Sequence, residues 1–196
     1  MPKHEITRAD IMAMDEYATV RDARRKTLTQ LKRHRRVAVG PDVTFYFENF
    51  ETMWMQIHEM LRIEGGGDAQ IDDELAAYNP LIPNGRELTA TMMIEIDDEA
   101  RRARVLAGLG GIEDSVSLSL AGDTVPAVSE TEVERTTETG RTSSIHFLHF
   151  PFTDAQVATF RDPKTQVVLA IAHANYGHMA VLPADVQQAL AADFDP

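Results

Sequence analysis

The sequence contains no cysteine, one tryptophan and no long apolar run. The lack of cysteine excludes disulfides, zinc–thiolate sites, iron–sulfur clusters and cysteine nucleophiles, and it fits a reducing compartment. The longest apolar run, at 167–172, is far shorter than the roughly 20 residues of a membrane helix. The first 15 residues mix charged and apolar side chains and lack the apolar stretch of a signal peptide. We therefore expect a cytoplasmic protein that does not interact with membranes.

Several signatures of enzyme families are also missing from the sequence. It has no glycine-rich loop ending in Lys-Ser/Thr, no Gly-x-Ser-x-Gly motif and no His-Glu-x-x-His helix. Gly108, Gly110 and Gly111 follow a predicted helix rather than a strand, which is typical of a helix C-cap and turn. These absences leave the reaction class open.

The net charge of −12 is distributed unevenly along the 196 residues. Residues 1–40 carry ten Lys or Arg and five Asp or Glu, whereas 41–196 carry nine and twenty-six, so +5 precedes −17. The acidic part repels nucleic acid, and no aromatic residues interleave with the basic run to stack on bases, so nucleic-acid binding is disfavoured. We expect a protein partner or a homo-oligomer instead. The partner-binding candidates in the basic run are Arg21, Arg24, Arg25, Arg33 and Arg36.

Apolar spacing, glycine and proline divide the chain into helices and strands. Thr7 followed by Asp10 is typical of a helix N-cap, and apolar residues then recur at helical spacing. Helices are predicted at 8–35, 51–64, 68–78, 97–109 and 183–194, with a further short helix capped by Thr153. Strands are predicted at 43–48, 89–96, 116–120, 144–150, 167–173 and 178–182, with one or two edge strands at 124–139.

This order of elements predicts an α+β fold. Successive strands joined by short turns favour a largely antiparallel mixed sheet with helices packed on one side and a long N-terminal helix. The continuous apolar strand at 167–173 is expected in the centre of the sheet. We expect a basic N-terminal helical arm at 1–40 and a single α+β domain at 41–196, which together form one folding unit.

Histidine is the residue type here that is best able to carry chemistry, because a neutral imidazole binds metals and titrates near physiological pH. His146 and His149 lie three residues apart on a predicted strand, so they should point to opposite faces of the sheet. The ordinary interpretation is that one is a buried histidine bonded to a backbone carbonyl. The metal-binding interpretation makes both candidate ligands.

His173 and His178 flank a predicted turn, and the register of the hairpin decides whether they form a pair. A four-residue loop would place them opposite each other, with Cβ atoms roughly 4.5–5.5 Å apart. A bulge at Gly177 would instead pair His178 with Ala174 and separate the imidazoles. Both histidines are candidate metal ligands, and any cofactor would be a divalent metal with nitrogen and oxygen ligands. Asn175 and Tyr176 in the turn are ligand-binding candidates.

The predicted helix at 51–64 carries another candidate site. His58 lies at the edge of its apolar face, four residues after Trp54, and Glu48 is close in sequence. Imidazole together with carboxylate suits iron, manganese or zinc. A histidine at the boundary of the core is the competing interpretation. We take Glu48, Trp54 and His58 as ligand-binding candidates.

Four strings together resemble the bacterial "domain of unknown function 3501" family. They are FYFEN at 45–49, TMW at 52–54, ELAAYNPLIP at 74–83 and NYGHM at 175–179. Tyr78 and Asn79, in the third string, are also ligand-binding candidates. The family is uncharacterised, but its members are often encoded beside rubrerythrin-like and iron–sulfur proteins. The resemblance therefore implies a role near iron, peroxide or electron-transfer chemistry.

Two functions follow as expectations. The first is an accessory or partner-binding protein, linked to an iron, peroxide or electron-transfer system. The alternative is a metal-dependent or histidine-assisted enzyme that acts on a small molecule, with catalytic residues that the sequence leaves unknown.

Overall fold

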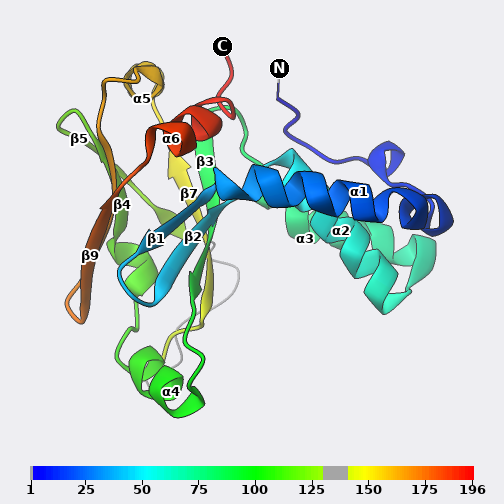
Figure 1. Cartoon of the computed structure of the whole chain (residues 1–196), viewed down its shortest axis with the longest axis horizontal. Helices are drawn as coiled ribbons and strands as arrows, with labels where there is room; N and C mark the ends of the chain where they lie inside the picture. The colour runs from blue at the N-terminus through cyan, green and yellow to red at the C-terminus, as the bar shows by residue number, and fades with distance from the viewer. Residues whose placement is uncertain (1, 130–140) are drawn as a thin grey trace.

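The strands form two antiparallel sheets, as the computed structural model shows for residues 2–129 and 141–196 (Figure 1). The first sheet has the order β1 (Arg36–Val39), β2 (Val43–Phe47), β3 (Glu87–Ile94), β7 (Ile145–Pro151) and β6 (Val128–Ser129). The second has the order β5 (Asp123–Pro126), β4 (Val116–Leu120), β8 (Val167–His173) and β9 (Tyr176–Val181). β1 and β9 lie next to each other and close one side of the resulting sandwich.

The two sheets pack together because their strands alternate between apolar and polar residues. In β2, for example, Val43, Phe45 and Phe47 are buried, while the two residues between them are half-buried. The inward-facing side chains of both sheets belong to one continuous cluster, which includes Leu118 and Leu169. The sandwich therefore has a single apolar core.

Three helices cover the ends of the sandwich. They are α4 (Glu99–Ala107), α5 (Asp154–Arg161) and α6 (Ala184–Ala191). Thr153 caps α5 and forms a capping box with Gln156. Phe152, Phe160 and Phe194 meet edge to face and fix α5 and α6 to the sandwich. α4 lies at the opposite end (Figure 1).

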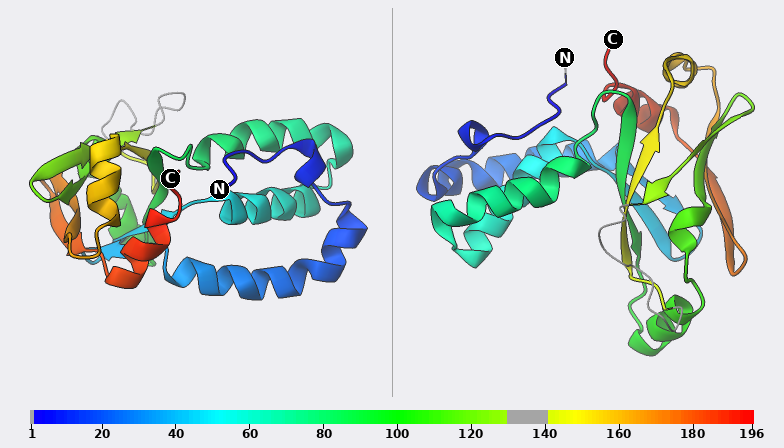
Figure 2. Two further views of the ribbon diagram at one scale, coloured as in Figure 1. Left: turned by 90° about the horizontal axis from the view of Figure 1, so that it is seen from above. Right: turned by 180° about the vertical axis from the view of Figure 1, so that it is seen from behind.

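The remaining helices form a lobe that projects from the side of the sandwich (Figure 2). This helical lobe contains α1 (Met14–Arg33), α2 (Phe50–Glu64) and α3 (Ile71–Tyr78), together with the N-terminal residues 2–13. Asn49 caps the start of α2, and Gly65, with φ +64°, ends it. Short 3-10 turns occur at Arg8–Asp10, Gly67–Gln70, Asn79–Leu81 and Ile112–Ser115.

The α+β class and the antiparallel pairing are confirmed, but the arrangement differs in two ways from the prediction. Two packed sheets replace the single mixed sheet, and the helices lie at several places rather than on one side. The strand at 167–173 is confirmed as an interior strand, because β8 lies between β4 and β9. No helix in the described ranges is long and apolar enough to span a membrane.

The predicted helix at 8–35 is wrong at both ends. The capping box of Thr7 and Asp10 exists, but it starts a 3-10 turn of three residues, and α1 begins only at Met14. At the other end the chain leaves the helix after Arg33 and enters β1, which pairs with β2. Of the predicted edge strands at 124–139, β5 and β6 are present, and residues 130–139 lie outside the described residues.

Candidate functional site

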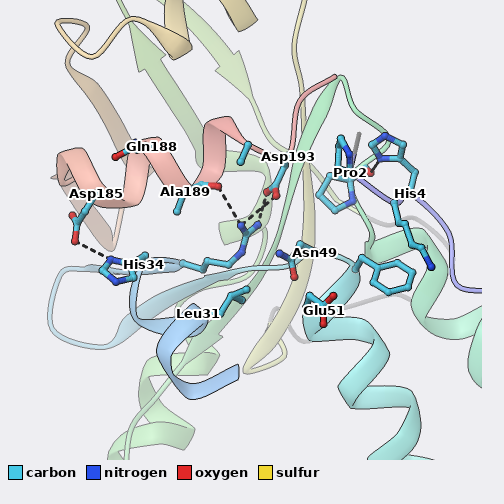
Figure 3. A pocket seen from close by; sticks show the side chains of 15 residues that line it. Pro2, His4, Leu31, His34, Asn49, Glu51, Asp185, Gln188, Ala189 and Asp193 are labelled. Atoms are coloured by element: carbon cyan, nitrogen blue, oxygen red, sulfur yellow. Dashed lines mark hydrogen bonds and ion pairs between the residues drawn. The ribbon is translucent and has the colours of Figure 1, made fainter. Parts of the chain in front are cut away.

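A cleft of about 800 Å³ lies where the helical lobe meets the sandwich (Figure 3). Segments far apart in the sequence form its walls: the N-terminal residues, the end of α1, the start of α2 and one side of α6. Most of the lining surface is apolar. The lining residues are Pro2, Lys3, His4, Leu31, His34, Arg35, Asn49, Phe50, Glu51, Pro83, Asp185, Gln188, Ala189, Ala192 and Asp193.

The floor of the cleft is a buried ion pair between Arg35 and Asp193 (Figure 3). The guanidinium of Arg35 also donates hydrogen bonds to the carbonyls of Phe47, Glu48 and Ala189. Burial raises the pKa of the Asp193 carboxyl, and the charge of Arg35 opposes that rise. Since all donors of Arg35 are engaged, the pair joins α1, β2 and α6 rather than offering a free cation.

Two histidines stand at opposite ends of the cleft. Nδ1 of His34 lies 3.0 Å from the carboxylate of Asp185 on α6. The ring of His4 donates to the carbonyl of Pro83 and contacts the carboxylate of Asp195 at 3.0 Å. These contacts connect the N-terminal segment and α1 to the C-terminal part of the chain.

Two smaller hollows lie along the interface of α1 and α2, and one of them adjoins the cleft. One, of about 230 Å³, shares Leu31 and Glu51 with the cleft and is also lined by Leu28, Trp54 and Met55. The other, of about 240 Å³, lies on the far side of Leu28 and is lined by Arg25, Thr29, Lys32, Thr52, Gln56 and Glu59. The C-terminal half of α1 therefore rests on α2 with unfilled space on both sides of Leu28.

The predicted partner-binding arginines divide into two groups. Arg21 makes a two-pronged ion pair with Glu59 of α2, and the guanidinium of Arg24 lies 4.9 Å above the ring of Trp54. Arg25, Arg33 and Arg36 are exposed, and none of them forms an ion pair with another described residue. The basic arm thus neutralises part of its own body and leaves the rest of its charge facing solvent.

His58 is fully buried and hydrogen-bonded at both ring nitrogens. Its Nδ1 donates to the carbonyl of Trp54, and its Nε2 accepts from the backbone N–H of Met12 at 3.0 Å. The rings of Trp54 and Tyr17 pack against it, with centroids 3.9 and 4.8 Å away. Burial lowers the pKa of His58. The neutral ring therefore fixes the N-terminal segment to α2.

The hydroxyl of Tyr17 donates to the Glu59 carboxylate at 2.7 Å. The hydrogen bond from Arg21 lowers the pKa of Glu59 to about 2, and burial raises the pKa of Tyr17. These three side chains form the polar contact that holds the N-terminal half of α1 on α2.

Asn79 and Tyr78 lie on the other side of the helical lobe. The Asn79 side chain pairs with both backbone groups of Ile6, and the indole of Trp54 donates to the carbonyl of Asp10. The N-terminal segment is thereby bound along α2 and α3. The hydroxyl of Tyr78 lies 3.5 Å from the Gln56 amide.

Glu48 is buried at the end of β2, where its carboxylate accepts a hydrogen bond of 2.7 Å from Thr91. Of the ligand-binding candidates, Trp54 and His58 are in direct contact, and Trp54 also lines the hollow that adjoins the cleft. The backbone carbonyl of Glu48 accepts a hydrogen bond from Arg35, so Glu48 takes part in the contact between the helical lobe and the sandwich.

The β8–β9 hairpin has a two-residue turn, so neither of the two predicted registers is correct. His173 lies opposite Tyr176, and His178 lies opposite Ile171. The ring of His173 contacts the Gly110 carbonyl, and the ring of His178 packs against Tyr176. The two histidines are therefore offset along the hairpin rather than directly opposed.

Asn175 and Tyr176 connect this hairpin to its surroundings. Asn175 donates to the carbonyl of Gly108, and the Tyr176 hydroxyl accepts from two backbone N–H groups and donates to the carbonyl of Val39. The ring of His178 and the hydroxyl of Tyr176 lie so close to Gly40, whose φ is +73°, that a Cβ there would clash with both. Asn175 thus holds the hairpin turn on the end of α4, and Tyr176 holds β9 on the turn between β1 and β2.

His146 and His149 point to opposite faces of β7, as the strand spacing predicts. His146 is fully buried, with Nε2 3.0 Å from the hydroxyl of Thr142 and Nδ1 3.6 Å from Glu113. His149 lies on the outer face, 3.1 Å from Glu87. Together with the hairpin, this leaves the four candidate metal ligands at separate places. Within 2–129 and 141–196, no three ligand-type side chains gather to hold a metal.

Sequence reasoning missed the residues that shape the cleft, above all Arg35, Asp193, His4 and His34. Arg35 stands in a basic run, where a solvated side chain is the ordinary expectation. The one local signal is the alternation of exposed and buried positions in β1, which begins directly after it. Nothing near Asp193 in the sequence indicates its partner.

The fold and the cleft define an α+β protein in which a helical lobe is joined to a two-sheet sandwich. The chain belongs to the DUF3501 family of proteins of unknown function, whose model matches residues 5–194. It is similar to the crystal structure of a protein of unknown function from Burkholderia pseudomallei K96243, with 36% identity and a TM-score of 0.90. That match covers 97% of this chain and 99% of the other. None of the curated proteins matches the chain.

Proposed function

We propose that this protein is a cytoplasmic accessory protein that binds a segment of a partner protein in the cleft. The observation that carries the proposal is the cleft itself: about 800 Å³ of mostly apolar surface that the chain's own packing leaves unfilled. Its size falls within the range of binding sites, and it lies at a junction between two parts of the fold, where such sites are common. The cytoplasmic location rests on the absence of cysteine.

The charges around the cleft favour a partner segment that is apolar and flanked by carboxylates. Asp185 at the rim already faces His34, and Glu51 lies 3.7 Å from Arg24. The hollow on the far side of Leu28 presents Arg25 and Lys32, which form no ion pair with another described residue. Acidic side chains of a partner that extends from the cleft across the C-terminal half of α1 would complement these two cations, so binding should weaken with salt.

The system to which the partner belongs is inferred from the resemblance to the DUF3501 family. We propose a partner from an iron, peroxide or electron-transfer system. In this role the protein acts by binding, and the buried His58 holds on α2 the N-terminal segment whose first residues line the cleft.

The experiment compares tryptophan substitutions at the two ends of α6, at its first residue and at its C-cap. Ala192→Trp places an indole in the cleft, whereas Ala184→Trp places it on α6 outside the lining. Both positions are exposed, so both variants should fold. Immobilised wild-type protein captures partners from extracts of the native host at low salt, and the captured protein is then purified and titrated against each variant.

We expect Ala192→Trp to weaken binding at least about tenfold, which corresponds to about 1.4 kcal/mol, and Ala184→Trp to leave it unchanged. A captured protein that belongs to an iron or redox system would support the finer proposal. Equal binding by both variants would show that the partner binds elsewhere, and failure to capture any protein would count against a partner-binding role.

A further inference from the structure

The outer face of α1 carries an ordered row of charged side chains. Tyr17 is the buried residue of this 20-residue helix, and Arg24 and Leu28 lie on the same side, toward α2. At 3.6 residues per turn, Asp15 and Lys26 fall on the opposite side, where both are exposed. α1 lies along the border of the lobe, so this side faces solvent (Figure 2).

Four charged residues form a straight row along that face: Asp15, Asp22, Lys26 and Arg33. Their spacings are seven, four and seven residues, which read the same in both directions. Eighteen residues make five full helical turns, so the first and last members of the row point in the same direction, about 27 Å apart. All four side chains are exposed.

The order of charges in the row is acid, acid, base, base. A second copy laid antiparallel, about a two-fold axis midway between Asp22 and Lys26, places the partner's Arg33 beside Asp15 and the partner's Lys26 beside Asp22. The two-fold repeats both pairs on the other side. A parallel copy would instead oppose like charges, so the row is complementary to itself in one orientation only.

The charged side chains of the row are available to pair with a second copy. None of its four members forms an ion pair with another described residue. Thr19 and Thr29, which lie between the charges, donate their hydroxyls to carbonyls of their own helix, Glu16 and Arg25. Their side chains can therefore lie in the seam without unsatisfied hydroxyl groups.

The shape of the molecule permits the antiparallel arrangement. The sandwich lies at the C-terminal end of α1 (Figure 1). In an antiparallel pair the two sandwiches would thus stand at opposite ends, away from each other. The cleft lies on the other side of α1 and would stay open, so this inference goes beyond the proposed function and does not depend on it.

We propose that the protein forms a two-fold dimer through antiparallel pairing of α1 with α1 of a second copy. The contacts are exposed ion pairs, which are individually weak and screened by salt. The dimer is therefore a weak one that forms at low ionic strength and dissociates as salt rises.

Reversing single charges in the row tests the proposal, because combining two reversed charges should restore the dimer. Sedimentation velocity of the full chain over a range of concentrations, at about 20 mM and about 500 mM salt, measures self-association. We expect Lys26→Asp and Asp22→Lys each to weaken the wild-type dimer about tenfold at low salt, because each opposes like charges twice. Mixing the two variants should restore dimers, since each then meets its complement. The double variant D22K/K26D should dimerise as the wild type does.

The matched controls carry the same change of net charge elsewhere. Lys164→Asp and Asp123→Lys are exposed and distant from α1, and they should leave the dimer intact. Circular dichroism checks that each variant keeps its helices. A wild-type protein that stays monomeric at low salt, or a dimer that the α1 variants and the controls affect equally, would overturn the proposal.

Discussion

The sandwich and the helical lobe are packed in different ways. In the sandwich, strands such as β2, β4 and β8 bury alternate side chains in one continuous apolar core. In the lobe, the longest helix, α1, fully buries Tyr17 alone. Its other apolar side chains, such as Leu28, are only partly buried against α2, and polar contacts such as the ion pair of Arg21 with Glu59 add to their hold. A helix that is polar nearly all round derives little stability from burial and is available for recognition. α1 is therefore a surface element attached to a stable body.

The largest effect is expected at the joint between the two regions. Arg35→Ala would leave the Asp193 carboxylate buried without its partner, so the free energy of unfolding should fall by about 3–5 kcal/mol. Urea denaturation measures this loss. The control is Arg36→Ala, at the exposed neighbouring residue, which should change the free energy of unfolding by less than about 0.5 kcal/mol. A loss as small as that of the control would mean that the ion pair does not join the regions.

A matched pair of leucines compares the packing of the two regions directly. Leu169 is fully buried in β8, whereas Leu28 is half-buried between two hollows. Leu169→Ala should cost about 3 kcal/mol through lost burial and a new cavity, and Leu28→Ala less than about 1 kcal/mol. Denaturant unfolding gives both values, and equal costs would contradict the contrast.

His58 should make the stability of the protein depend on pH. Burial lowers its pKa below the ordinary 6.5, so below pH 6.5 the unfolded chain binds a proton that the folded protein does not. Stability is therefore present in full above pH 6.5 and falls as the pH drops, by at most about 1.4 kcal/mol per pH unit. Thermal unfolding followed by the fluorescence of Trp54, the sole tryptophan, measures the slope.

The matched variant is His58→Phe, which keeps an aromatic ring beside Trp54 but cannot titrate. It should be less stable at neutral pH, because the Met12 N–H loses its acceptor, and its stability should vary less with pH. The same pH profile in both proteins would show that other groups cause the dependence.

The smallest effect is expected at the polar contact that holds α1. Folding lowers the pKa of Glu59 from 4.5 to about 2, so the ionised carboxylate stabilises the folded protein. This stabilisation is present in full above pH 4.5 and is lost as the pH falls toward 2. Because the side chain is partly exposed, solvent screening limits this contribution to about 1 kcal/mol or less. Glu59→Gln should remove it at neutral pH and flatten the acid limb of the stability profile, as measured by urea unfolding from pH 5 to pH 2.5.

Local patterns in the sequence predict much of the fold. Alternation in 116–120 gives β4 with its observed bounds, and Thr153 caps α5 as its position before an apolar helix indicates. The end of α1 was mispredicted because Lys and Arg favour helix, while the four-residue strand β1 is stabilised by pairing with β2. The division into two sheets depends on such long-range pairing.

The candidate site was harder to predict than the fold. The cleft is built from the N-terminal segment, α1, α2 and α6, and its central ion pair joins residues 158 positions apart. No local spacing indicates such a contact. The spacing of His146 and His149 did predict that they lie on opposite faces of a strand, because that follows from strand geometry alone.

Native-state hydrogen exchange tests most directly the claim that α1 is a weakly packed element on a stable sandwich. Amides in the C-terminal half of α1, at 24–33, should exchange through local opening with a free energy well below that of global unfolding. Amides of β3 and β8 should exchange only when the whole protein unfolds. Equal protection of α1 and β8 would show that α1 is packed as firmly as the sandwich.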